Sequence, residues 1–96
     1  SGVPSEFTVV GNFPNPFNPS TNIRYGLPQE GKVKITISDL LGKEVKSFLV
    51  SHMIAGYHSV VWNGKDNQDR SVSAGVYLYQ IQAGEFVHTK KMVLLK

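Results

Sequence analysis

The sequence predicts an all-β fold, an antiparallel β-sandwich of about seven short strands. Short segments alternate apolar and polar residues with a period of two, and turn-forming residues separate them at intervals of about 8 to 12 residues. No segment shows the period of an amphipathic helix. We interpret the 96 residues as one domain over residues 3–96, with residues 1–2 as a cloning remnant.

The predicted strands follow one another closely along the chain. The clearest one places Val33, Ile35 and Ile37 on one face with polar residues between them. The first is expected to be an edge strand that ends at Gly11, and the fourth loses its alternation, which predicts a bulge or a sheet edge. The assignment of residues 52–56 stays open. The expected strands cover residues 7–10, 22–27, 32–38, 44–51, 57–62, 76–83 and 86–95.

The alternation also predicts which side chains form the core. The segment that ends at Trp62 is expected to turn the Trp62 face inward, because large aromatic side chains fill the middle of small sandwiches. The strand after Gly75 places Tyr77, Tyr79 and Ile81 on one face. The strand number and the turn spacing predict an immunoglobulin-like or fibronectin-like sandwich, and Tyr77, at the start of a late strand, would suit its tyrosine corner.

Three connections carry turn signals. The run Asp39-Leu40-Leu41-Gly42 has Asp first and Gly fourth, which is typical of a type I turn. The pair Gly84-Glu85 predicts a two-residue hairpin. Residues 63–71 are rich in Asn, Asp, Gly and Gln and contain no apolar residue to pack, which predicts a long exposed loop.

Residues 12–21, which we call the collar, differ from the rest of the chain. Three of the collar residues are prolines, which remove three backbone donors and fix three φ angles, so the collar can be neither a helix nor a central strand. The collar also carries Phe13 and Phe17, and we therefore interpret it as a stiff clamp pressed against an apolar surface. It would then either close one end of the domain or present a surface to a partner.

Composition and motifs argue against most kinds of chemistry. The chain has no Cys and no Gly-x-Ser-x-Gly elbow, and its three His residues lack the spacing of metal ligands. The net charge of +3 is spread along the chain, unlike the basic stripe of a nucleic-acid binder. No apolar run approaches the roughly 20 residues of a membrane span. The chain does not open with the charged and apolar regions of a signal peptide, so we expect any signal peptide in another part of a longer protein. We expect a non-catalytic domain without cofactor or metal.

Three groups of residues leave alternatives open. The polar loop either supplies oxygen ligands to calcium or only forms turns, through Asn63, Asp66, Asn67 and Asp69. The large aromatic residues either stack on sugars or fill the core: Tyr25, Tyr57, Trp62, Tyr77 and Tyr79. The lysines of the last strand either dock a partner or protect an exposed sheet edge: Lys90, Lys91 and Lys96.

Several segments form a recognisable series when they are taken in order. They are residues 12–21 (NFPNPFNPST), 23–28 (IRYGLP), 39–42 (DLLG), 55–58 (AGYH), 62–64 (WNG), 75–79 (GVYLY) and 90–96 (KKMVLLK). This ordered series resembles the type A C-terminal sorting domain of proteins exported by the type IX (Por) secretion system. That family has a fold similar to the immunoglobulin-like module of flagellar hook-capping proteins.

The resemblance implies a sorting signal at the end of a larger secreted protein. Such a domain follows N-terminal cargo domains, is recognised in the periplasm by the outer-membrane translocon and its sorting and cleavage machinery, and reaches the cell surface or the medium. The residues that the resemblance marks for partner recognition are Pro14, Asn15, Pro16, Phe17, Gly75, Tyr77, Lys91, Met92, Val93, Leu94, Leu95 and Lys96. An edge strand that ends in residues 93–96 would suit β-augmentation by a receptor, whereas the structural alternative is that it only completes the sandwich.

The chain departs from the family pattern at two positions. Asn63 stands where the family usually has Asp, and Asp69 stands where a Gly often closes the loop. Because Asn and Asp tolerate left-handed backbone geometry, we expect the loop to keep its shape. Two other functions fit the predicted fold. One is a carbohydrate-binding or spacer module of an extracellular enzyme, and the other is a structural assembly domain like the hook-capping module. As a sorting domain, the chain is expected to be a monomer in isolation.

Overall fold

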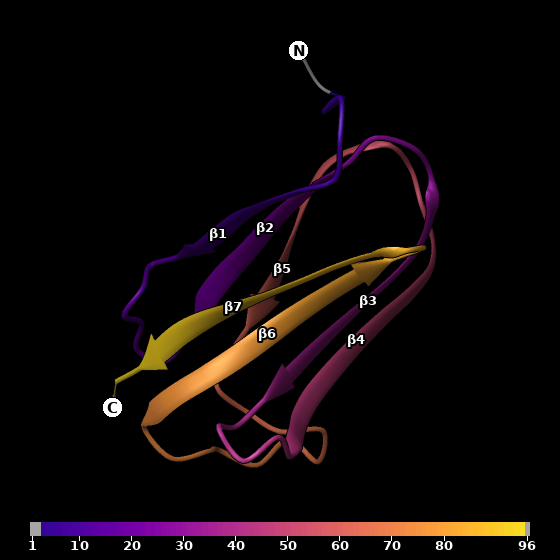
Figure 1. Ribbon diagram of the computed structural model, residues 1–96. Coiled ribbons are helices and arrows are strands. Elements are labelled where there is room, and N and C mark those ends of the chain that lie inside the picture. The colour runs from indigo at the N-terminus through magenta and orange to yellow at the C-terminus, as the bar shows by residue number, and fades with distance from the viewer. Residues whose placement is uncertain (1–2, 96) are drawn as a thin grey trace.

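The computed structural model describes residues 3–95, and these residues form two packed antiparallel sheets without a helix (Figure 1). The three-stranded sheet has the order β1-β2-β5, and the four-stranded sheet has the order β4-β3-β6-β7. In the described range, accordingly, no helix is long and apolar enough to cross a membrane. The predicted all-β sandwich is confirmed. Its strands are β1 (Thr8–Phe13), β2 (Thr21–Leu27), β3 (Gly31–Ser38), β4 (Glu44–Met53), β5 (Gly56–Trp62), β6 (Gly75–Ala83) and β7 (Phe86–Leu94).

The core lies between the two sheets and follows the predicted alternation. Val33, Ile35 and Ile37 of β3 are buried, and the Trp62 face of β5 points inward, as predicted. Ile23 of β2 and Ile81 of β6 reach the same interior from opposite sheets. Burial of such apolar side chains provides the main driving force for folding a chain of this size.

The first strand is longer than predicted. Gly11 does not end β1, because β1 continues to Phe13 through a register shift between Val9 and Gly11. Gly11 has φ +136°, a conformation that L side chains rarely adopt, so the glycine accommodates a bulge inside the strand. The prediction that β1 is an edge strand is confirmed.

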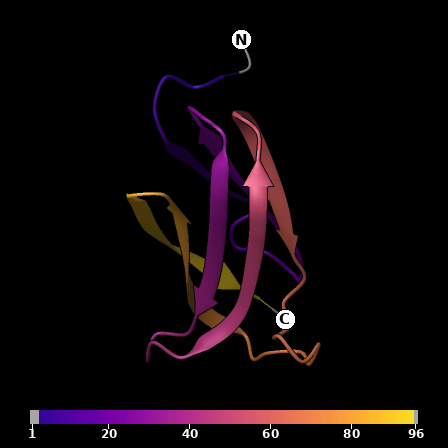
Figure 2. The same ribbon diagram turned by 90° about the vertical axis from the view of Figure 1, so that its right-hand side faces the viewer.

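The predicted turns are present. The side chain of Asp39 accepts backbone hydrogen bonds from Leu41 and Lys43, each at 2.9 Å, and the β3–β4 hairpin reverses there (Figure 2). Strand β4 is an edge strand with an irregular register, as its broken alternation predicted. Ala83 pairs with Phe86 across the two-residue hairpin between β6 and β7.

The polar loop between β5 and β6 is largely exposed, as predicted, and hydrogen bonds fix its position. Asn67 docks the loop on the edge strand β4: its backbone amide donates to the carbonyl of Val45 at 3.0 Å, and its side-chain oxygen accepts from the amide of Ser47 at 3.0 Å. Asp69 has φ +64°, so it takes the left-handed conformation expected of the residue that replaces Gly. Backbone and side-chain hydrogen bonds hold this loop in place, and the loop contains no apolar residue that could indicate where it docks.

Candidate functional site

The collar is anchored by one of its two phenylalanines. Phe17 is 1% exposed and packs against Trp62, with 5.7 Å between the ring centroids. Phe13 is 56% exposed, so the prediction that both rings press on an apolar surface is wrong for Phe13. Phe13 belongs to the edge strand β1, and its ring lies near Gly11 instead of entering the core.

A buried polar network fixes the two ends of the collar to each other. The side-chain amide of Asn12 donates to the hydroxyl of Thr21 at 3.2 Å, and this hydroxyl donates to the carbonyl of Pro14 at 2.8 Å. Asn12 and Thr21 are the only buried polar side chains in the described part of the chain. Sequence reasoning missed both residues. Their position, as the polar residues that flank a proline-rich segment, is the signal that could have identified them.

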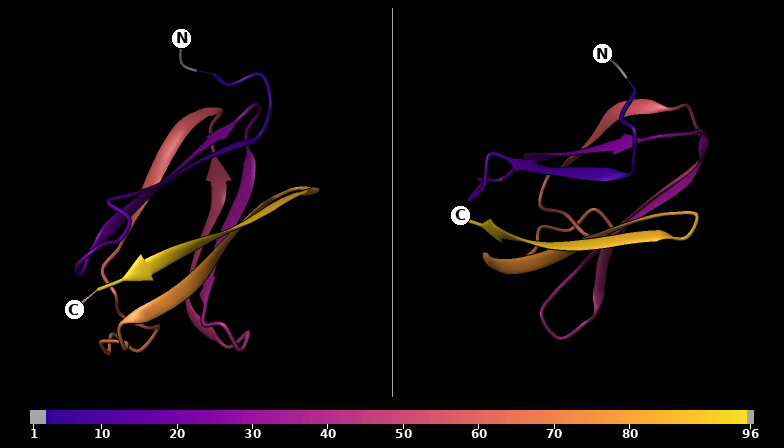
Figure 3. Two further views of the ribbon diagram at one scale, coloured as in Figure 1. Left: turned by 60° about the vertical axis from the view of Figure 1, so that its left-hand side comes forward. Right: turned by 45° about the horizontal axis from the view of Figure 1, so that its top comes forward.

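The collar is hydrogen bonded to the tail, by which we mean residues 91–95. The amide of Phe17 donates to the carbonyl of Val93 at 3.0 Å, and the amide of Leu95 donates to the carbonyl of Phe17 at 2.7 Å. The side-chain oxygen of Asn15 also accepts a hydrogen bond from the amide of Val93 at 3.1 Å. The collar therefore forms a short parallel bridge on the free edge of β7, where the views of Figures 1 and 3 both place it beside the end of the chain.

Gly75 and Tyr77, which the resemblance also marks for partner recognition, lie beside the same end of β7. Gly75 pairs with Leu94 and Tyr77 pairs with Met92 in the β6–β7 ladder. The hydroxyl of Tyr77 donates to the carbonyl of Ser73, four residues upstream, which is the bond of a tyrosine corner. Burial raises the pKa of this hydroxyl, and the nearby Asp39 carboxylate raises it further.

The predicted recognition residues therefore come together, but they differ in accessibility. Those with exposed side chains are Pro14, Asn15, Pro16, Lys91 and Leu95. Those buried in the core are Phe17, Tyr77, Met92 and Leu94. Val93 and Gly75 are partly exposed, and Lys96 lies outside the described residues. Among the recognition residues that the structure describes, a partner of the folded domain can reach the side chains of the first group and the exposed part of Val93 and Gly75.

The aromatic residues do not form a sugar-stacking platform. Trp62 is fully buried between Phe17 and Tyr77, and its indole N–H donates to the carbonyl of Lys65 at 2.8 Å. Tyr25, Tyr77 and Tyr79 are also buried, and Tyr57 alone of the five candidates is exposed. The core assignment of Trp62 is confirmed.

Asp66 of the polar loop accepts hydrogen bonds from groups of the same loop. The carboxylate of Asp66 accepts hydrogen bonds from the backbone amides of Arg70 and Gln68, each at 2.9 Å. The Arg70 amide contributes most to lowering the pKa of Asp66. Over residues 3–95, no three His, Cys, Asp or Glu side chains gather in a way that could hold a metal ion.

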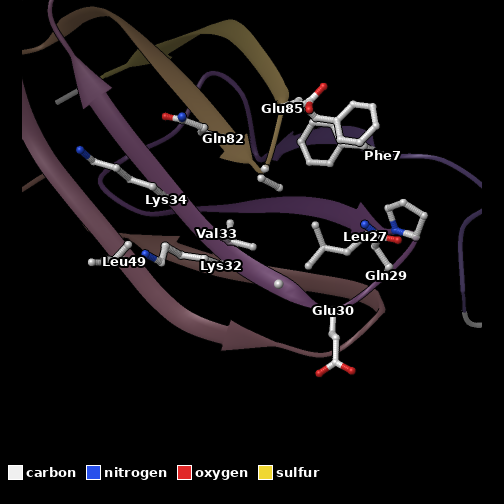
Figure 4. Close-up of a pocket in the computed structure, with 15 residues that line it drawn as sticks. Phe7, Leu27, Gln29, Glu30, Lys32, Val33, Lys34, Leu49, Gln82 and Glu85 are labelled. Atoms are coloured by element: carbon white, nitrogen blue, oxygen red, sulfur yellow. The ribbon is translucent and has the colours of Figure 1, made fainter.

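A groove of about 890 Å³ lies at the opposite end of the sandwich, where β2 turns into β3 and β6 turns into β7. Its walls include Phe7, Leu27 and Phe86, and its charged residues include Glu30 and Glu85. Figure 4 shows Glu30 and Glu85 on opposite sides of the groove, with Glu30 pointing away from it. The two carboxylates therefore cannot act as a pair, and none of the lining residues is Ser, Thr, Cys or His.

Known structures share this fold. Dimeric latent PorU from Porphyromonas gingivalis matches with a TM-score of 0.76 and 22% identity, over 93% of this chain and 9% of PorU. FlgD from P. aeruginosa matches with a TM-score of 0.63 and 18% identity, over 97% of this chain and 74% of FlgD. PorZ, an essential bacterial surface component of the type-IX secretion system of P. gingivalis, matches with a TM-score of 0.63 and 21% identity, over 100% of this chain and 13% of PorZ.

These three likenesses show the fold, and this chain corresponds to only a small part of PorU and PorZ. No curated protein matches the chain closely. The model of the FlgD Ig-like domain matches residues 19–86, which is more than half of the sequence. The chain therefore belongs to the FlgD Ig-like domain family.

Proposed function

We propose that this chain is a type A C-terminal sorting domain that directs a larger cargo protein through the type IX secretion system. In this role the domain is non-catalytic. It passes through the periplasm behind N-terminal cargo domains, meets the outer-membrane translocon and its sorting and cleavage machinery, and arrives at the cell surface or in the medium. The observation that carries the proposal is the hydrogen-bonded contact between collar and tail, two segments that the sequence resemblance marks independently.

The contact supports recognition of a folded surface. Met92 and Leu94 are buried in the core, so the receptor reads the outward residues of the tail together with the adjacent collar. On this account Lys91, Val93 and Leu95 supply the tail side chains. Asn15 and the prolines beside it complete the surface, because Asn15 holds the amide of Val93.

The known relatives support the proposal at the level of fold. PorU and PorZ share this sandwich, and PorZ is a surface component of the type-IX secretion system. A domain with this fold therefore occurs in a component of that secretion system. The specific sorting role rests on the ordered motif series and on the meeting of collar and tail.

Export of a reporter protein tests the proposal. Residues 3–96 are fused behind a periplasmic reporter in a host with the type IX machinery, and we expect the reporter outside the cell. Deleting residues 91–96 would remove buried Met92 and Leu94 along with the tail surface, so substitutions are preferable. The double variant Val93→Ser with Leu95→Ser changes the outward tail residues, and we expect it to fold and to lose export.

Val61→Ser is the matched control, because Val61 is an exposed apolar residue on the other sheet. Normal export of this control, together with loss in the tail variant, supports recognition through the tail. Export of the tail variant at the level of the unmodified fusion would contradict it.

A structural assembly role, like that of a hook-capping module, is the second candidate. The FlgD Ig-like family match and the likeness to FlgD favour it. It predicts self-association of the isolated domain at micromolar concentration, whereas the sorting role predicts a monomer. Sedimentation velocity distinguishes the two.

A further inference from the structure

The free edge of β7 is divided into two parts by the collar. Near the tail, the amide and carbonyl of Val93 and the amide of Leu95 point away from β6, because they bond to collar residues. Backbone groups of an antiparallel strand alternate in direction with a period of two residues. The amides and carbonyls of Val87, Thr89 and Lys91 therefore also point away from β6.

Within the described range, no strand pairs with these groups. In residues 3–95, β7 pairs with β6 and otherwise only with Phe17, at Leu94. Every side chain from Phe86 to Lys91 is exposed, although each of these residues pairs with a residue of β6. Figure 3 shows this half of β7 extending away from the collar to the hairpin at the other end of the strand.

We propose that the β7 edge over residues 87–91 accepts an extended strand from a partner protein, and that this strand carries acidic side chains. The inference deepens the proposed sorting function, on which it rests for the source of the strand, a component of the export machinery. Backbone hydrogen bonds to an open sheet edge supply affinity, and the side chains beside the edge supply specificity.

The charge of the edge selects the occupant. Lys90 and Lys91 are exposed at one end of this stretch, and Lys34 lies on the same outer face as Val87, with Gln82 between them in the β3–β6–β7 register. A carboxylate-bearing strand beside β7 would meet Lys90 and Lys91, whereas Lys34, two strands further into the sheet, only adds to the positive charge of the outer face. A second copy of the chain would instead bring two further lysines to the same edge, and like charges across a strand pair are destabilising.

The apolar residues at the hairpin define the other end of the binding stretch. Phe86 and Val87 are 50% and 48% exposed, and Phe86 stacks on Phe7 with 5.7 Å between ring centroids. Apolar side chains of the partner can pack here, while its acidic side chains meet the lysines. The partner cannot extend over residues 93–95, because Phe17 occupies that edge and is buried against Trp62. The expectation that a receptor adds a strand at residues 93–96 is therefore wrong for residues 93–95.

A synthetic peptide in which Glu and Val alternate is the probe. It is added to the isotope-labelled chain, and amide hydrogen exchange is followed by NMR. We expect the amides of Val87, Thr89 and Lys91 to become protected, since these amides point outward. The Thr89→Pro variant removes one outward amide without removing a β6–β7 bond, and it should weaken peptide binding by about tenfold.

Thr89→Val is the matched control, because it changes the side chain and keeps the amide. It should bind like the unmodified chain. If Thr89→Pro does not fold, the double variant Lys90→Glu with Lys91→Glu tests the proposal independently. This variant should no longer bind the Glu-containing peptide and should bind the matching Lys-containing peptide. Self-association through β7 without peptide, or equal binding of both peptides by the unmodified chain, would overturn the proposal.

The outcomes separate this inference from the sorting function. Normal export by the Thr89→Pro fusion leaves the sorting function in place and contradicts use of this edge by the machinery. Failure of the unmodified fusion to be exported contradicts the sorting function. Peptide binding that depends on the Thr89 amide would then still identify the edge as a strand-binding site.

Discussion

The amide of Phe17 donates a hydrogen bond to the carbonyl of Val93 at 3.0 Å, which joins the beginning of the sandwich to its end. The ring of Phe17 packs on Trp62 in the core, while its backbone pairs with the last strand. One residue therefore couples the stability of the fold to the geometry of the surface formed by collar and tail. A change at Phe17 should affect both properties, and a change at Asn15 should affect chiefly the surface.

Replacing Phe17 by Ala should lower the free energy of unfolding by about 3 to 5 kcal/mol, because a large aromatic side chain is removed from a packed core. Urea denaturation monitored by Trp62 fluorescence measures the change. Phe13→Ala is the matched control in the same segment. Since Phe13 is exposed, the control should change stability by no more than about 0.5 kcal/mol. Equal losses in the two variants would show that the collar is not anchored through Phe17.

Replacing Thr21 by Val should destabilise the chain by about 1 to 3 kcal/mol. The substitution preserves volume but removes the hydroxyl that bonds both to Asn12 and to Pro14, and it leaves the Asn12 amide buried without that acceptor. Thermal unfolding measures the effect. Thr8→Val is the control, because the Thr8 hydroxyl makes only an exposed bond to the carbonyl of Glu6. A neutral Thr21→Val variant would mean that the network does not hold the collar.

Replacing Tyr77 by Phe should cost about 1 to 2 kcal/mol, because the bond from the hydroxyl to the carbonyl of Ser73 is lost while the ring remains in the core. Chemical denaturation gives the difference. Tyr57→Phe provides the comparison, since Tyr57 is exposed on the other sheet. A cost at Tyr57 that matches the cost at Tyr77 would argue against a tyrosine corner.

Stability should fall in alkaline solution above about pH 10. Burial raises the pKa of Tyr25, Tyr77 and Tyr79, so the folded chain keeps phenol protons that the unfolded chain releases. The unfolded state then binds fewer protons than the folded state, and the free energy of unfolding decreases as pH rises. Below the ordinary tyrosine pKa this contribution is fully present. Denaturation midpoints across the alkaline range measure the fall, and it should be smaller for Tyr79→Phe; an equal fall would contradict the assignment.

Local sequence patterns predicted the strands and turns whose conformation depends mainly on neighbouring residues. The period of two in β3 identified its buried face, and the Asp39 and Gly84 turns followed from the conformations that these residues prefer. Asp69 takes a left-handed conformation because Asp is one of the few residues other than Gly that tolerates it. Given the sandwich type, the position of Tyr77 near the start of a late strand suited a tyrosine corner, and its hydroxyl bonds to the carbonyl of Ser73.

Features that depend on contacts between distant parts of the chain were not predicted from the sequence. Gly11 was expected to end a strand, but pairing with β2 continues through it as a bulge. Phe13 and Phe17 are the same residue type in the same segment, and only the path of the collar determines that Phe17 reaches Trp62. The bond between Phe17 and Val93 joins backbone groups, which carry no residue-specific signal.

The measurement that most directly tests the central claim is export of the reporter by fusions that are first shown to be folded. The unmodified domain, the Asn15→Ala variant and the Val61→Ser control are compared for reporter in the medium or on the surface against reporter in the periplasm. We predict export with the unmodified domain and with Val61→Ser, and reduced export with Asn15→Ala, because Asn15 holds the tail amide of Val93. Retention of the unmodified, folded fusion in the periplasm would contradict the account.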